Sequence, residues 1–345
     1  MASSLALTLE QKQCPVCHTQ EGLQRCGGCR AVYYCGREHQ ASHRNSHKHA
    51  CNAMKKAFEA LHRTEHKLRA LQQADLLFLA EQVGRFWDIQ ETRDNIRARF
   101  ALVETMILHF KSANAVLDSL VHLMHMLDLC QSDNLGMRWV APALYLRLGW
   151  DQQCYDFLKW CATKGERIRY YRWDEKDEPP LRFDGADVLE SPEGMWTGPL
   201  IQLGHAACVM LIKVRVVLDL QHMLNATRAL EGVMPREIID EIRGSSLVSS
   251  VVALRKDIIR ASTERTAELL RLVKHQVTVL FRTIAIYNRA FWPALVDSDS
   301  RPERRADAYP PGSAEEAAVA VMHNREAWME TPGSIEVIKS LMKVA

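Results

Sequence analysis

The stretch CPVCHTQEGLQRCGGCRAVYYCGREHQASHRNSHKHAC, residues 14–51, decides how the N-terminal part of this chain folds. It contains six of the ten cysteines, arranged as Cys14-x2-Cys17, Cys26-x2-Cys29, Cys35-x3-His39 and His47-x3-Cys51. A Cys-x2-Cys pair on a tight turn points two sulfurs at one ion, and ligands four residues apart project from one face of a helix. Four such half-sites predict two four-coordinate Cys/His sites, which is the arrangement of structural zinc.

Metal binding is expected to drive the folding of this segment. A stretch this short cannot bury a core that offsets the entropy of ordering it. Each structural zinc supplies on the order of 10 kcal/mol or more. Gly27 and Gly28 are expected to form the tight turn of the second pair. Four nearby cations are expected to offset the negative charge of sites with three thiolates each: Arg25, Arg30, Arg37 and Lys48.

A disulfide framework is the alternative interpretation of these cysteines. It has less support, because residues 1–13 lack the basic start and long apolar core of a secretory signal. The four remaining cysteines are scattered along the chain, as is usual for intracellular proteins.

The spacing of the eight ligands resembles that of the MYND zinc finger, a family that binds two zinc ions in an interleaved pattern. The resemblance implies one ion on Cys14, Cys17, Cys35 and His39, and the other on Cys26, Cys29, His47 and Cys51. The family usually has Cys at the position of His39, and imidazole is also a competent zinc ligand. It usually has Trp at the position of Arg44. In some members that Trp and a nearby Gln, here Gln40, form part of a groove for proline-containing peptides.

Composition describes an ordinary soluble protein. Of its 345 residues 47% are hydrophobic and 25% charged, and the net charge of +2 gives no overall attraction to nucleic acid or anionic membranes. The most apolar stretch, residues 208–220, is interrupted by Lys213, Arg215 and Asp219, so we expect no membrane span. These features predict a cytoplasmic or nuclear protein.

The rest of the chain predicts helices, and the expected fold class is all-α. Apolar residues recur at helical spacing and no useful run alternates with period two, so no sheet is expected. Helices are predicted at 52–80, 93–110, 115–129, 136–148, 152–162, 200–230, 235–243, within 249–290, 313–330 and 334–344. Ser313 and Glu316 form a predicted capping box.

The domains follow from this pattern. They are a finger at 14–51, a connecting helical segment at 52–92, a helical TPR-like domain at 93–296 with an irregular insertion at about 164–199, and a C-terminal helical segment at 313–345. The paired helices around Gly149 favour TPR-like hairpins. The helical body has its own apolar stripes, and we expect it to fold without the finger.

Four further motifs resemble those of a fungal group of MYND-finger proteins with a single helical domain. They are Phe86-Trp87-Asp88-Ile89-Gln90-Glu91-Thr92-Arg93, Ala143-Leu144-Tyr145-Leu146-Arg147-Leu148-Gly149, Tyr155-Asp156-Phe157-Leu158-Lys159-Trp160 and Phe291-Trp292-Pro293-Ala294-Leu295. The resemblance implies a fold and no settled activity.

A non-enzymatic, zinc-binding adaptor in transcriptional regulation or ubiquitin-linked complexes is the function that the resemblance implies, with unidentified protein partners. The alternative is a MYND-associated lysine methyltransferase, but that architecture needs strand-rich SET segments, which the sequence lacks. A DNA-binding role has no recognition helix to support it. His122 and His125, three residues apart, form at most half a metal site.

Overall fold

The computed structural model describes residues 5–74, 83–165, 184–198, 201–297 and 309–344. The chain divides into two compact units, which we call the finger unit, Leu9–Leu144, and the helical unit, Met1–Thr8 with Tyr145–Ala345. Helix dominates the described residues, which confirms the all-α prediction. The division falls near residue 144, whereas the sequence places domain limits at 51 and 92. Most of the predicted insertion at 164–199 lies outside the described residues.

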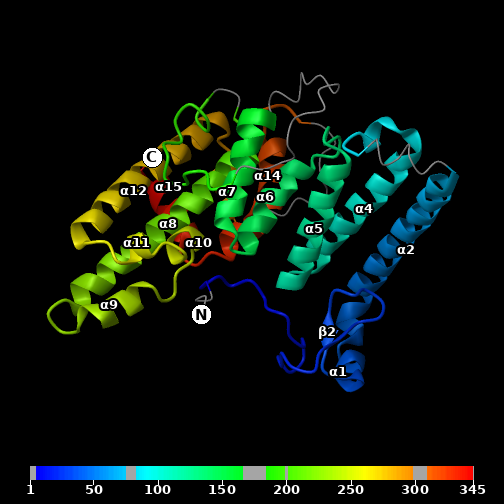
Figure 1. Ribbon diagram of the computed structural model, residues 1–345, viewed down its shortest axis with the longest axis horizontal. Helices are drawn as coiled ribbons and strands as arrows, with labels where there is room; N and C mark the ends of the chain where they lie inside the picture. Colours follow the sequence, from blue (N-terminus) through cyan, green and yellow to red (C-terminus); the bar gives the residue numbers. More distant parts are fainter. Residues whose placement is uncertain (1–4, 75–82, 166–183, 199–200, 298–308, 345) are drawn as a thin grey trace. The chain divides into compact units, whose positions relative to one another are not determined.

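The finger unit contains one small sheet that the sequence did not predict. Its elements are β1 Gln24–Arg25, β2 Tyr33–Tyr34, α1 Arg37–Ser42, α2 Arg44–Ala74, the 3-10 turn η1 Phe86–Asp88, α4 Gln90–His109 and α5 Ala113–Leu129 (Figure 1). β1 and β2 pair antiparallel, with Gln24 opposite Tyr34. These strands lie inside the finger, and the expectation of no sheet concerned the chain after it; two-residue strands are too short to show an alternating pattern.

Helix α2 joins the metal-binding stretch to the helices that follow. It begins at Arg44 and runs through Cys51 without a break, so the expected limit at residue 51 lies inside a helix. In Figure 1 α2 (blue) runs beside α4 (cyan), and the two helices are in contact. One buried cluster unites the finger with α2, α4 and α5; it contains Cys14, Cys26, Cys29, Ala31, Tyr34, Cys51, Met54, Leu61, Leu102, Met106, Phe110 and Ala115. The ligand-bearing finger and the helices that follow it therefore share buried residues, and the expectation that the helical body folds without the finger stays a prediction.

The motif around Trp87 forms the entry to α4. Thr92 donates its hydroxyl hydrogen to the carbonyl of Phe86, and Arg93 Nε donates to the carbonyl of Trp87 at 2.7 Å. The guanidinium of Arg97 lies 5.2 Å from a ring centroid of Trp87. Thr92 and Arg93 thus satisfy carbonyl groups of η1, and Arg97 packs against the Trp87 ring. These contacts explain why the residues of this motif occur together.

The helical unit is built around α8. Its helices are α7 Asp151–Trp160, the π-turn η2 Cys161–Gly165, α8 Leu203–Leu230, α9 Arg236–Arg243, α10 Ser250–Ala253, α11 Lys256–Ile259, α12 Thr263–Tyr287, α13 Phe291–Val296, α14 Ala314–Met329 and α15 Ser334–Val344, while α6 Met137–Arg147 spans the division between the units. Helix α8 is buried on nearly every side and packs against α7, α9, α12, α14 and α15. Ser313 caps α14 by accepting from Glu316 N at 3.1 Å, as predicted, while Glu316 accepts from Gly312 N.

Three charged residues that interrupt the apolar stretch of α8 are buried with partners. Arg215 and Asp151 are both fully buried and form an ion pair. Lys213 Nζ donates to Gln276 Oε1 at 2.7 Å and to two backbone carbonyls. The carboxylate of Asp219 accepts from the N–H groups of Val248 and Ser249, each at 2.9 Å. A buried charge is tolerated when its hydrogen-bonding groups are satisfied, and here these bonds connect α8 to its neighbours.

Gly149, between α6 and α7, has a backbone and a packing reason to be glycine. Its φ of +73° is in the left-handed region that side chains disfavour. A Cβ at this position would also lie only 2.5 Å from Cδ1 of Leu5. Both features agree with the turn that the sequence predicts there. Across the described residues, none of the helices combines the length and apolar character needed to span a bilayer.

Candidate metal centre

The two Cys-x2-Cys pairs form turns of the same design. His18 N donates to Cys14 O and Arg30 N donates to Cys26 O, each at 2.9 Å. His18 and Arg30 occupy equivalent positions and both have positive φ, 58° and 56°. Gly27 and Gly28 lie in the second turn, as expected, while its residue with left-handed backbone is Arg30. Gly28 has a different role, because a Cβ there would lie 2.7 Å from Cys51 Sγ.

The first cluster brings Cys14, Cys17, Cys35 and His39 together from two turns and α1. The Sγ atoms of Cys17 and Cys35 are 3.6 Å apart, and those of Cys35 and Cys14 are 3.9 Å apart. His39 presents Nδ1, which lies 3.0 Å from Cys35 Sγ and 3.7 Å from Cys14 Sγ. Cys14 is buried, while Cys17 is exposed.

The second cluster consists of Cys26, Cys29, His47 and Cys51, and all four are buried. Cys26 and Cys51 place their Sγ atoms 3.8 Å apart. His47 presents Nε2, 3.4 Å from Cys29 Sγ. The last two ligands, His47 and Cys51, come from the first turns of α2. The second ion would thus be held between a turn of the finger and the helix that continues into the core.

Both arrangements fit tetrahedral zinc. With Zn–S of about 2.3 Å and Zn–N of about 2.0 Å, a tetrahedron has edges of about 3.8 Å between sulfurs and about 3.6 Å between sulfur and nitrogen. In the structure the sulfur–sulfur distances are 3.6–3.9 Å and the sulfur–nitrogen distances are 3.0–3.7 Å, and both ranges include the expected value. Sulfurs this far apart are not disulfides, whose S–S bond is about 2.05 Å. The chain therefore carries two zinc-binding clusters, each with three cysteines and one histidine.

The sulfurs titrate unequally when no cation is present. Burial opposes ionisation of Cys14, but backbone hydrogen bonds from Cys35, Cys17 and Val16 outweigh it and lower the pKa of this thiol to about 6. Burial raises the pKa of Cys29 to about 12, and the nearby charges of Cys26 and Cys51 act in the same direction. A divalent cation removes this mutual repulsion, so metal binding is coupled to proton release.

Aromatic rings support the second cluster, and the sequence did not indicate them. The ring of His43 stacks on that of His47 at 5.6 Å, and its Nδ1 is hydrogen bonded to the hydroxyl of Tyr34 at 2.9 Å. Phe110, which directly follows α4, meets the ring of His47 edge-on at a centroid distance of 6.4 Å. The structure therefore places His43 behind the ligand His47, as a support and not as a ligand.

The nearby cations divide differently from the expectation. Arg25 Nε donates to Tyr33 Oη at 2.6 Å, and the guanidinium of Arg30 lies 5.4 Å from the ring centroid of Phe58. Arg37, one of the four expected cations, lines a pocket beside the second cluster together with Arg44, which was not among them. Burial raises the pKa of Cys51, and the positive charge of Arg44 opposes this rise. The position of Arg44 in the sequence does not by itself show that its side chain lies near Cys51.

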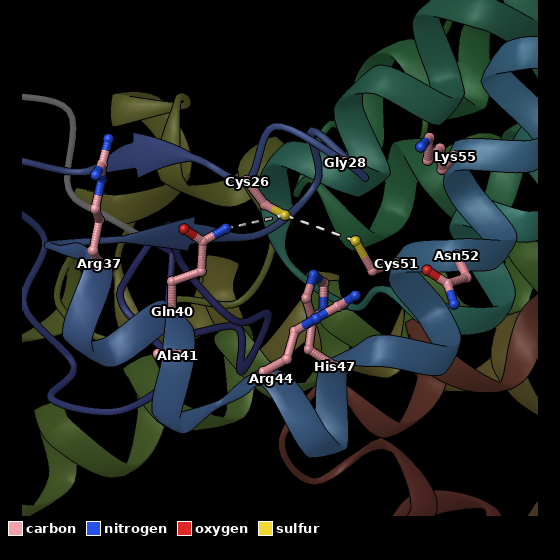
Figure 2. A pocket seen from close by; sticks show the side chains of 10 residues that line it. All are labelled: Cys26, Gly28, Arg37, Gln40, Ala41, Arg44, His47, Cys51, Asn52 and Lys55. Carbon is pink, nitrogen blue, oxygen red and sulfur yellow. Dashed lines mark hydrogen bonds between the residues drawn. The ribbon is translucent and has the colours of Figure 1, made fainter.

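Figure 2 shows a pocket beside the second cluster, where Gln40 and Arg44 project from α1 and the start of α2. Gln40 Nε2 donates to Cys26 Sγ at 3.6 Å. The two positions singled out by comparison with the peptide groove therefore line one pocket, with a cation in place of an aromatic ring.

His122 and His125 are not part of a third metal site among the described residues, where only the two finger clusters bring three or more potential ligands together. Arg99 lies against the imidazole of His125 and also forms an ion pair with Glu65 at 3.2 Å. Burial and the charge of Arg99 lower the pKa of both histidines.

Comparison with known families agrees with this geometry. Residues 14–51 match the family model described as "MYND finger". Neither curated proteins nor solved structures gave a match to the chain. The finger is thus a MYND finger, and the match ends where α2 passes into the shared core.

Proposed function

We propose that this protein is an adaptor: the finger binds a protein partner, the helical unit provides further binding surface, and the chain catalyses no reaction itself. The single observation that carries this proposal is the donor set of the two clusters. Each cluster offers three sulfurs and one imidazole nitrogen within 4.8 Å of one another. A zinc ion held by four protein ligands has no open position for an activated water, and such sites stabilise structure. MYND fingers as a class mediate protein interactions, which supports the same conclusion.

The setting of this function is the reducing interior of the cell, the cytoplasm or the nucleus. None of the ten cysteines, all of which lie in the described residues, forms a disulfide, and six of them belong to the zinc clusters, which supports such an environment. We further propose that the helical unit is a TPR-like stack of the kind found in the fungal group that the four motifs resemble. Helical hairpins of that kind present concave surfaces that suit protein ligands.

The lysine methyltransferase alternative has less support from the structure. SET architecture requires strands on both sides of the finger. In the described part of the chain, the only sheet is the two-residue pair β1 and β2 inside the finger. No observation in the described residues favours this activity.

Affinity purification from the native host tests the adaptor function. The wild-type protein, Cys35→Ala and the matched control Cys130→Ala are each tagged, and captured proteins are quantified by mass spectrometry. Cys130 is a buried cysteine of the same unit and is not a ligand. We expect a set of partners with wild type and Cys130→Ala that is lost with Cys35→Ala, because three ligands cannot close the site.

Two results would contradict the proposal. One is identical capture by all three proteins. The other is methyl transfer from S-adenosylmethionine to cell-extract proteins that disappears with one substitution in the helical unit.

A further inference from the structure

The pocket beside the second cluster has a volume of about 510 Å³ and is built entirely from the finger and the beginning of α2. Its inner wall includes the buried ligands Cys26, His47 and Cys51. This pocket is therefore formed only when the zinc-binding fold is in place. Its outer walls come from side chains that take no part in binding the metal.

Positive charge dominates these outer walls. Arg37, Arg44 and Lys55 line the pocket, and no Asp or Glu does. In the view of Figure 2 Arg37 and Lys55 lie on opposite sides, with Arg44 between them. Neither arginine has an ion-pair partner among the described residues, and Lys55 lies 3.9 Å from Glu59 in an exposed pair of small energetic weight.

The metal cluster does not cancel this charge. Three thiolates and one Zn²⁺ give the second cluster a net charge of −1, and Arg44 is the cation that acts on Cys51. Arg37 and Lys55 then leave the pocket with an excess of positive charge. An anionic ligand is the complementary occupant.

Two amide side chains add donors and acceptors to the same pocket. Gln40 is half-buried, and its Nε2 is held by Cys26 Sγ. Asn52 is exposed on the next turn of α2 after His47 and also lines the pocket. Primary amides can pair with both the N–H and the C=O of a peptide backbone. Cations and amides in one pocket suit an extended peptide that carries carboxylates.

We propose that this pocket binds an acidic peptide segment of the partner protein. Carboxylate side chains of the peptide pair with Arg44 and with Arg37 or Lys55, and the amides of Gln40 and Asn52 bind its backbone. The inference rests on the adaptor function proposed above and specifies the chemistry of the partner.

A peptide fits the pocket better than a nucleic acid does. Proteins that bind single strands stack bases on aromatic rings and follow the backbone with a basic groove. No Phe, Tyr or Trp lines this pocket. The chain as a whole has a net charge of only +2, which offers little further attraction for a polyanion.

Fluorescence anisotropy with the zinc-loaded full-length chain tests the proposal. The probes are a short fluorescein-labelled peptide in which Glu alternates with Ala, the same peptide with Gln in place of Glu, and an oligo-dT strand. We expect the Glu peptide to bind at least about tenfold more tightly than the Gln peptide, with affinity that falls as salt rises. Equal binding of the two peptides, tighter binding of the oligonucleotide, or no binding of the Glu peptide would overturn the proposal.

Charge reversal locates the binding site. Arg44→Glu should weaken binding of the Glu peptide about tenfold, because it removes an attraction and adds a repulsion. Arg63→Glu is the matched control, since Arg63 is exposed on the same helix and does not line the pocket. It should change the affinity less than about twofold. Arg37→Glu gives a second test at a position in α1 that would remain informative if Arg44→Glu lost its zinc. Unchanged binding by the Arg37 variant and by a zinc-loaded Arg44 variant would overturn the assignment.

The same variants separate this inference from the adaptor function. If Cys35→Ala loses its cellular partners while Arg44→Glu and Arg37→Glu keep all of them, the adaptor function stands and the acidic-peptide site is wrong. If Cys35→Ala also keeps every partner, the adaptor function itself fails.

Discussion

Truncating Met54 should weaken zinc binding even though Met54 is not a ligand. Met54 follows Cys51 on α2, is fully buried, and packs in the cluster that contains the cysteine ligands and residues of α4. Removing a fully buried Met side chain costs about 2–5 kcal/mol, because apolar burial is lost and a cavity is left. We take about 3 kcal/mol for Met54→Ala.

This cost becomes a change in metal affinity through linkage. Metal-free fingers of this size are usually unfolded, so zinc binding must supply the free energy of folding. A loss of about 3 kcal/mol in the folded state should then lower the zinc affinity by about a hundredfold. Competition with a zinc chelator measures the affinity, and denaturant unfolding of the zinc-loaded protein measures the stability.

Leu108→Ala is the matched control. Leu108 lies on α4 of the same unit but is 75% exposed, so its truncation should change zinc affinity less than about threefold. If Met54→Ala behaved like this control in both measurements, the finger would fold independently of α2 and α4. The shared buried cluster would then carry no energetic coupling between the metal ligands and the helices, contrary to the prediction.

Three further predictions concern single residues. His39→Cys should keep two zinc ions per chain by elemental analysis, while His39→Ala should bind the first ion more weakly. The reason is that His39 Nδ1 lies as close to Cys35 Sγ and Cys14 Sγ as two ligand atoms of one tetrahedral site do. Tight binding of two ions by the Ala variant would exclude His39 as a ligand. Asp151→Ala should lower the free energy of unfolding by about 3–5 kcal/mol in denaturant unfolding, because the fully buried guanidinium of Arg215 would lose its carboxylate partner. A loss below about 1 kcal/mol would show that the guanidinium is hydrogen bonded to water or to another group instead. Burial lowers the pKa of Lys213 to about 8 from 10.5, so the unfolded chain binds more protons between these values and stability rises with pH there. Between pH 8 and pH 10 the wild type should gain about 2 kcal/mol relative to Lys213→Met, and parallel stability curves for the two proteins would contradict the shift.

Features that depend on residues close together in the chain could be predicted from the sequence. A pair of ligands three or four residues apart projects toward one ion wherever the local turn or helix forms, so the four half-sites follow from the spacing. The resemblance to the MYND finger implied which half-sites share an ion, and the structure groups them in that way. Helix positions and the cap formed by Ser313 also depend on neighbouring residues, so their periodicity and chemistry are visible in the chain. The two-residue strands of the finger were not predicted, because they are too short to show a repeating pattern of apolar residues.

The tertiary structure alone decided which distant residues meet. Arg44 approaches Cys51 because α2 begins beside the second turn, and Gly28 is required because Cys51 Sγ lies against its backbone. The buried pair of Arg215 and Asp151, 64 residues apart in the chain, joins α8 to α7. Such contacts depend on how helices pack, and packing is set by the summed burial of many side chains rather than by any local pattern. For the same reason, the finger's limit at residue 51 agrees with the family match, while only the structure shows that α2 continues through it into a shared core.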